Sequence, residues 1–123
     1  MSDPVASQPK VIIIVLAWNR LSDTLECLES IRKIEYRNYQ IMVVDNGSTD
    51  GSADAIAARY PEIILIKNES NLGYAAGNNK GIEKALQMGC DYVFLLNNDT
   101  TVDAACLDEL IKTAASDSRI GAA

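Results

Sequence analysis

Four short apolar runs, each rich in β-branched residues, constrain the fold of this chain more than any other feature of its sequence. The runs are continuous rather than alternating, which is typical of strands buried on both faces of a parallel sheet. Segments with apolar residues at helical spacing separate them, so the predicted order is β-α-β-α-β-α-β-α. Right-handed crossovers then place helices on both faces of the sheet. The predicted strands are Val11–Leu16, Ile41–Val44, Ile63–Ile66 and Tyr92–Leu96, and the helical sets are Leu21–Ile31, Ala53–Tyr60, Ala75–Leu86 and Leu107–Ala114, with Asp103 as the N-cap of the last.

Composition excludes several classes of protein. The 123 residues fit one compact domain, which we expect over residues 11–123 after a flexible N-terminal segment at residues 1–10. With 11 basic and 17 acidic side chains the formal charge is −6, which disfavours binding to a nucleic-acid backbone. Histidine is absent, so Ser-His and Cys-His nucleophile pairs and His-ligated zinc are excluded and acid-base chemistry must come from carboxylates.

Cysteine usage and the length of the apolar runs bear on location. Three widely spaced cysteines and the absence of an export signal favour a reducing cytoplasm. The longest apolar run, Val11–Ala17, is far too short to span a membrane. We therefore expect a cytoplasmic chain without a membrane span of its own.

Polar residues cluster directly after each predicted strand, at the edge of a parallel sheet where α/β proteins bind ligands. Asp45 ends the second strand and can accept hydrogen bonds from a ligand, although the segment that it begins also suits a plain turn and helix cap. Asn97, Asn98 and Asp99 end the last strand and offer the oxygen ligands that Mg²⁺ or Mn²⁺ takes together with phosphate oxygens. The four clusters are Trp18–Arg20, Asp45–Gly51, Asn68–Gly73 and Asn97–Thr101.

Three glycines spaced by four residues, Gly73, Gly77 and Gly81, lie in or next to the third helical set. For Gly77 and Gly81, close packing of the helix on the sheet is the favoured interpretation. Gly73 stands at the helix start, where free N–H groups and the helix dipole favour an anion. Neither a Gly-x-Gly-x-x-Gly turn after the first strand nor a P-loop occurs, so dinucleotide and P-loop sites lack their signature.

Four motifs follow one another along the chain at the ends of the predicted strands: Val11–Arg20, Val43–Ser52, Asn71–Asn78 and Leu95–Asp99. In this order they resemble the nucleotide-binding half of family 2 glycosyltransferases of the GT-A fold, and the rhamnosyltransferase-like branch is the most similar. The resemblance implies an α/β fold with a Rossmann-like parallel sheet of about four strands, in the order 3-2-1-4, with helices on both faces.

The resemblance also implies roles for single residues. Ala17 and Trp18 would border the nucleobase, and Asp45 would bond a uracil or thymine ring. Asp99 matches the last acid of the family's Asp-x-Asp element, which contacts Mg²⁺ or Mn²⁺ and the diphosphate. Asn97 stands in place of the first acid and can contact ribose. The other residues assigned to the nucleotide pocket are Asn19, Asn46, Asn71, Gly73, Asn78 and Asn98.

Members of this family need a second half that supplies the acceptor site and, in the inverting reaction, a carboxylate base. The sequence ends at Ala123, where a further strand would begin. We therefore expect a truncated GT-A chain that binds a UDP- or dTDP-linked sugar, with the catalytic base beyond residue 123 and no transfer activity of its own. The intact enzyme would act on a saccharide or lipid-linked saccharide, and the inner face of the membrane is an alternative location for it.

Two other classes of protein stay open at this point. A nucleotidyltransferase-like or other Rossmann-like nucleotide-binding domain would have the same sheet and a different reaction. A non-catalytic module would associate through a sheet edge that truncation leaves unpaired. The same unpaired edge makes a homodimer an expected form of the chain.

Overall fold

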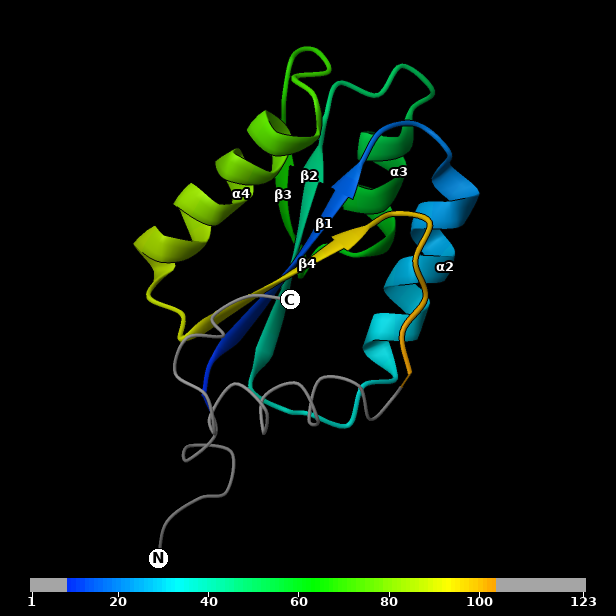
Figure 1. Ribbon diagram of the computed structural model, residues 1–123. Coiled ribbons are helices and arrows are strands. Elements are labelled where there is room, and N and C mark those ends of the chain that lie inside the picture. Colours follow the sequence, from blue (N-terminus) through cyan, green and yellow to red (C-terminus); the bar gives the residue numbers. More distant parts are fainter. Residues whose placement is uncertain (1–8, 104–123) are drawn as a thin grey trace, which may run out of the picture.

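The computed structural model describes residues 9–103, and the predicted elements of that range appear in the predicted order (Figure 1). Residues 1–8, most of the expected N-terminal segment, lie outside the described residues, as does the predicted helix at 107–114. The elements are β1 Val11–Ala17, α2 Leu21–Arg32, β2 Tyr39–Asp45, α3 Ser52–Arg59, β3 Ile64–Lys67, α4 Tyr74–Met88 and β4 Tyr92–Asn97.

The four described strands form one parallel sheet in the order β3-β2-β1-β4, which confirms the predicted order. The register aligns the strand ends, because Ala17 of β1 pairs with Asp45 of β2 and Leu16 pairs with Asn97 of β4. Asp45 in turn pairs with Lys67 of β3. The chain therefore leaves all four strands at one edge of the sheet, and the polar segments that follow them lie along that edge.

Alternate side chains of β1 pack on opposite faces of the sheet, because successive residues of a strand point in opposite directions. Ile13 belongs to a buried cluster with Leu28 of α2 and Ile56 of α3. Ile14 belongs to a second buried cluster with Ala85 of α4. In Figure 1, α2 and α3 accordingly cover one face and α4 covers the other, as predicted.

Helix α4 lies close against the sheet because glycines stand at its contact points. A Cβ atom at Gly77 would lie 2.8 Å from Cδ1 of Leu16. A Cβ atom at Gly81 would lie 2.9 Å from Cγ2 of both Ile14 and Val44. Ordinary Cβ contacts are longer, so the packing interpretation of these two glycines holds, and the first turns of α4 lie next to the ends of β1 and β2.

Strand boundaries differ slightly from the sequence prediction. β2 begins at Tyr39 rather than Ile41, because its backbone ladder with β1 continues beyond the apolar run. β3 begins at Ile64 rather than Ile63, because the N–H of Ile63 donates to the carbonyl oxygen of Tyr60 in a turn, at 3.1 Å. Among the described residues, no helix has the length and apolar character that crossing a membrane requires.

Candidate functional site

A hollow of about 260 Å³ lies beyond the ends of β1 and β4. The chain builds the sheet from β1 outward to β3 and then returns to add β4 on the other side of β1, so this is the topological switch point. Open α/β sheets bind their ligands at such a point. A larger hollow of about 610 Å³ runs along α2 near the last described residues, and we assign it no ligand. The residues that line the smaller hollow are Leu16, Trp18, Asn46, Asn71, Tyr74, Asn97, Asn98 and Asp99.

Asn46, the residue after β2, makes four hydrogen bonds and is only 3% exposed. Its Nδ2 donates to Oδ1 of Asn71 at 3.1 Å and to the carbonyl oxygen of Gly73 at 3.2 Å. Its Oδ1 accepts from Nδ2 of Asn68 and from the N–H of Leu72, both at 3.1 Å. These bonds use both donors and both lone pairs of the amide. Asn46 therefore ties the β3–α4 connection to the end of β2.

Asp45, the last residue of β2, is buried and holds its own loop in place. Its Oδ1 accepts a hydrogen bond from the hydroxyl of Ser48 at 2.5 Å, and its Oδ2 accepts from the backbone N–H of Ser48 at 3.1 Å. Asp45 does not line the hollow. A carboxylate has about four lone-pair sites, so Ser48 leaves acceptor capacity for a further donor.

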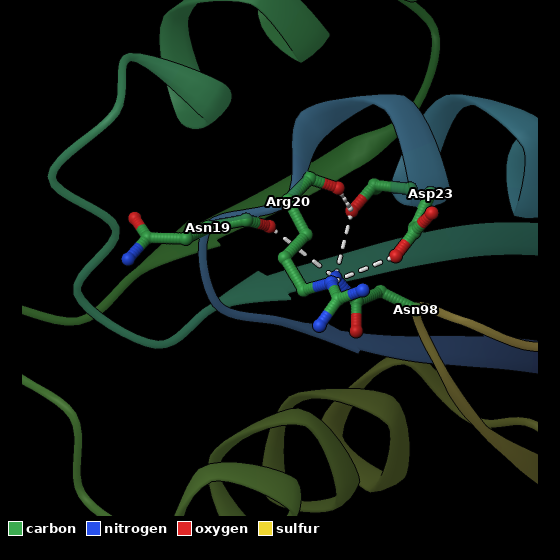
Figure 2. A network of polar contacts seen from close by, with 5 residues as sticks. Asn19, Arg20, Asp23 and Asn98 are labelled. Atoms are coloured by element: carbon green, nitrogen blue, oxygen red, sulfur yellow. Dashed lines mark hydrogen bonds and ion pairs between the residues drawn. The ribbon is translucent and has the colours of Figure 1, made fainter.

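The turn between β1 and α2 contacts the segments after β2 and β4. Asn19 and Arg20 both have a φ of 54°, a left-handed conformation that asparagine adopts more readily than most residues. Nδ2 of Asn98 donates to the carbonyl oxygen of Asn19 at 3.3 Å and to Oγ1 of Thr24 at 3.0 Å (Figure 2). In Figure 2 the side chain of Asn19 points away from Asn98, and its Oδ1 accepts from the N–H of Thr49 at 2.8 Å.

Of the lining side chains that are able to form hydrogen bonds, four make none within residues 9–103: Trp18, Tyr74, Asn97 and Asp99. Trp18 is 48% exposed and Tyr74 is 60% exposed, so both present a large apolar surface to solvent. Asn97, the last residue of β4, and Asp99, two residues further on, are exposed as well. These side chains are the ones that the fold leaves available to a ligand.

The donor set at the hollow can serve a metal ion only together with a ligand. In the described part of the chain, no three His, Cys, Asp or Glu side chains are placed so that they could hold a metal ion together. The hollow offers one carboxylate, Asp99, beside the amide of Asn97. Mg²⁺ is commonly held by one or two carboxylates and by the phosphate oxygens of a substrate. The residues therefore fit a divalent cation that is bound with a diphosphate.

Three residues that the sequence analysis assigned to the pocket are not among those that line the hollow. Ala17 is fully buried in the cluster beneath α2 and α3. Gly73 is the N-cap of α4, with a φ of 87°, and its N–H donates to Oδ1 of Asn71 at 2.8 Å. Asn78 is 4% exposed on the sheet-facing side of α4, and its Oδ1 has no hydrogen-bond partner among the described residues.

Cys27 of α2 lies behind the turn that follows β4, with its Sγ 3.9 Å from the carbonyl oxygen of Asn97. Burial, and after it the negative charge of Asp99, raises the pKa of the Cys27 thiol to about 11. Because the thiolate is the nucleophilic form of cysteine, Cys27 acts as a packing residue at neutral pH.

The structure brings together six of the residues that the sequence analysis assigned to the site. Asn19, like Asp45 and the three residues above, does not line the hollow. Tyr74 and Leu16 line it and were not predicted. Tyr74 could have been predicted from the sequence, because it is an aromatic residue directly after Gly73 at the expected helix start. The six predicted lining residues are Trp18, Asn46, Asn71, Asn97, Asn98 and Asp99.

A parallel sheet with a hollow at its switch point is the architecture of Rossmann-like α/β domains. The comparison with known protein families is more specific. Residues 12–123 match Glycosyl transferase family 2, and the chain belongs to that family. The resemblance carried by its four motifs is thereby confirmed.

Two curated relatives illustrate the relationship. The putative glycosyltransferase EpsH of Bacillus subtilis is 29% identical over 109 residues, which are 86% of this chain and 30% of the relative. The N-acetylglucosaminyl-diphospho-decaprenol L-rhamnosyltransferase of Mycobacterium tuberculosis is 31% identical over 103 residues, which are 77% of this chain and 34% of the relative. The chain thus spans about a third of the length of these two proteins.

Two solved structures share the fold. The mannosyltransferase PcManGT of Pyrobaculum calidifontis, in complex with GDP-Man and Mn²⁺, superposes with a TM-score of 0.78 and 24% identity. The match covers 90% of this chain and 34% of that one. Residues 1–349 of TarS from S. aureus, in complex with UDP, superpose with a TM-score of 0.76 and 21% identity, over 87% of this chain and 32% of that one. The chain therefore has a partial GT-A-like fold.

Proposed function

We propose that this chain is the donor-binding region of an inverting glycosyltransferase that uses a UDP- or dTDP-linked sugar with Mg²⁺ or Mn²⁺. The observation that carries the proposal is the hollow at the switch point, where the exposed side chains of Trp18 and Tyr74 stand beside Asn97 and Asp99. An aromatic surface next to a carboxylate suits a ligand with a flat base at one end and a metal-bound diphosphate at the other. Family membership supports the same assignment.

In this proposal each end of the donor has its own residues. The base lies against Trp18, and a ring N–H donates to a lone pair of Asp45 that Ser48 leaves free. The ribose lies at Asn97. The residue that would hold the cation is Asp99, and the cation would stabilise the negative charge of the leaving diphosphate.

The described residues hold the donor and do not supply the whole reaction. In the inverting reaction an acceptor hydroxyl loses its proton to a carboxylate as it attacks the anomeric carbon, and the nucleoside diphosphate leaves. Within residues 9–103, Asp99 is the carboxylate that lines the hollow, and it is assigned to the cation. We place the base and the acceptor site, for a saccharide or a lipid-linked saccharide, in the part of the enzyme that its longer relatives possess.

Calorimetry on the folded chain tests the proposal, with UDP, dTDP and GDP as ligands, each with and without Mn²⁺. We expect UDP or dTDP to bind, and Mn²⁺ to strengthen that binding. Asp99→Asn should remove the gain from Mn²⁺ and leave the metal-free affinity close to that of the wild type. Glu83→Gln, on the exposed side of α4, is the matched control for the loss of one carboxylate and should change neither.

Other outcomes of this experiment contradict the proposal. A well-folded chain that binds none of the three nucleotides, with or without Mn²⁺, would overturn it. In a parallel titration with UTP, tighter binding of UTP than of UDP would favour a nucleotidyltransferase-like domain instead. An equal loss of metal-free and metal-dependent affinity in Asp99→Asn would contradict the role given to Asp99.

A further inference from the structure

A continuous chain of hydrogen bonds joins Asp45, at the end of β2, to Asn98, which lines the hollow, through the turn between β1 and α2. It starts at Asp45, whose Oδ1 accepts from the hydroxyl of Ser48 at 2.5 Å. The same Ser48 oxygen accepts from the backbone N–H of Asn19 at 2.7 Å. The carbonyl oxygen of Asn19 accepts from Nδ2 of Asn98 at 3.3 Å, and Asn98 directly precedes Asp99. Asn19 therefore stands between the loop after β2 and the turn after β4.

The side chain of Asn19 strengthens one side of this connection and does not face the hollow. Its Oδ1 accepts from the N–H of Thr49 at 2.8 Å, and Asn19 is absent from the residues that line the hollow. Its left-handed backbone turns the N–H toward Ser48 and the carbonyl oxygen toward Asn98. Few residue types combine a left-handed conformation with a short side-chain acceptor, and asparagine is one of them.

We infer that Asn19 is a positioning residue that fixes the loop after β2, residues 45–49, relative to the turn that carries Asp99. This inference rests on the proposed function, because it concerns two ends of the same donor site. It differs from direct binding, in which the Asn19 amide would itself donate to the nucleotide. The two roles predict opposite results for one conservative substitution.

That substitution is Asn19→Asp, which keeps an oxygen for the Thr49 N–H, tolerates the left-handed backbone and removes the amide donors. Asn19→Gly also tolerates the backbone but removes the side-chain oxygen. If Asn19 positions the loops, the glycine variant loses affinity for the nucleotide and the aspartate variant retains it. If Asn19 donates to the ligand, both variants lose affinity. Asn79→Asp, on the exposed side of α4, controls for the added negative charge.

The experiment measures each end of the site with its own probe. Uridine, which carries no phosphate, reports on the base end, and the gain in UDP affinity on adding Mn²⁺ reports on the Asp99 end. We expect Asn19→Gly to weaken uridine binding by about fivefold, which is the usual effect of one lost hydrogen bond. The Mn²⁺ gain should fall by a similar factor, because the freer glycine backbone no longer fixes the carbonyl oxygen that accepts from Asn98. Asn19→Asp should keep both within about twofold of the wild type, because the Thr49 bond remains.

An NMR measurement without ligand tests the connection itself. Amide signals of Asn19→Gly should shift both in residues 45–49 and in residues 97–100, whereas those of Asn79→Asp should not. Equal losses of affinity in the glycine and aspartate variants would overturn the inference in favour of direct contact. A glycine variant that shows unchanged affinities, or a change at one end only, would also overturn it. A wild-type chain that binds neither uridine nor UDP would instead overturn the proposed function, and this inference with it.

Discussion

Replacing Gly47 by alanine should destabilise the protein far more than replacing Gly51, although the two glycines have nearly the same backbone conformation. Their φ angles are +84° and +83°. A left-handed alanine costs about 1 kcal/mol relative to glycine, and this cost applies to both positions. What differs is the space around each Cβ atom, so the pair separates backbone strain from steric contact.

The magnitude follows from the contacts of Gly47. A Cβ atom there would lie 2.5 Å from the carbonyl carbon of Ser70, 2.7 Å from its Cα and 2.8 Å from the backbone nitrogen of Asn71. At Gly51 nothing lies within 4 Å. Because the atoms near Gly47 belong to the backbone, the β3–α4 connection must move, at a cost of about 2–3 kcal/mol. Alanine reduces the entropy of the unfolded chain equally in both variants, so this term cancels in the comparison.

Urea unfolding of the wild type and the two variants measures the difference. Gly47→Ala should lose about 2–3 kcal/mol more unfolding free energy than Gly51→Ala, with an unchanged m-value. For a domain of this size the midpoint of thermal unfolding should differ by about 10 °C or more. Two variants with unfolding free energies within about 0.5 kcal/mol of each other would refute the reasoning, because the contact with Ser70 would then have no energetic consequence.

Three further predictions concern stability and thiol chemistry. Asn46→Ala should lower the unfolding free energy by about 2–4 kcal/mol through four lost hydrogen bonds, and should speed amide hydrogen exchange at residues 68–73; unchanged exchange there would contradict the role of Asn46. The hydroxyl of Tyr60 donates a hydrogen bond to Glu29 and holds the pKa of that carboxyl below its ordinary value. This hydrogen bond stabilises the folded protein at pH values above the ordinary glutamate pKa, and the stabilisation is lost as the pH falls through the lowered pKa of Glu29 in the folded protein. Tyr60→Phe should therefore lose less stability than the wild type between about pH 5 and pH 3 in a series of urea melts, and equal acid sensitivity would argue against the link. Burial raises the pKa of the Cys27 thiol to about 11, so peptide mass spectrometry after iodoacetamide treatment at pH 8 should find Cys27 labelled far more slowly than the less buried Cys90, and equal rates would contradict the burial of Cys27.

The sheet could be predicted from the sequence because its determinants are local. The apolar run at Val11–Leu16 and the runs like it are long enough to fix strands and too short for anything else. A polar residue after each strand then places the site at one edge, since parallel strands end together. Asp45 and Asn97 were predicted in this way to lie at that edge, and both do.

The division of work among the polar residues could not be predicted, because it depends on partners distant in the sequence. Asn46 bonds to residues 22 to 27 positions further along the chain, and Asn98 bonds to Thr24, 74 positions earlier. A run of asparagines in a loop looks the same whether each amide faces a ligand or another loop. Only the packing of α4 and α2 decides which amides are already bonded.

Some side chains that line the hollow are hydrogen-bonded to other parts of the protein and others are not, and this difference decides which positions can be varied to change the proposed nucleotide-sugar donor. Three side chains that line the hollow make no hydrogen bond within the described part of the chain: Trp18, Tyr74 and Asn97. Substitutions at these positions should therefore cost little stability. Asn46 lines the same hollow, and a change there loosens a whole loop. Under the proposed function, a library that varies these three positions and keeps Asn46 fixed would test new nucleotides on an intact scaffold.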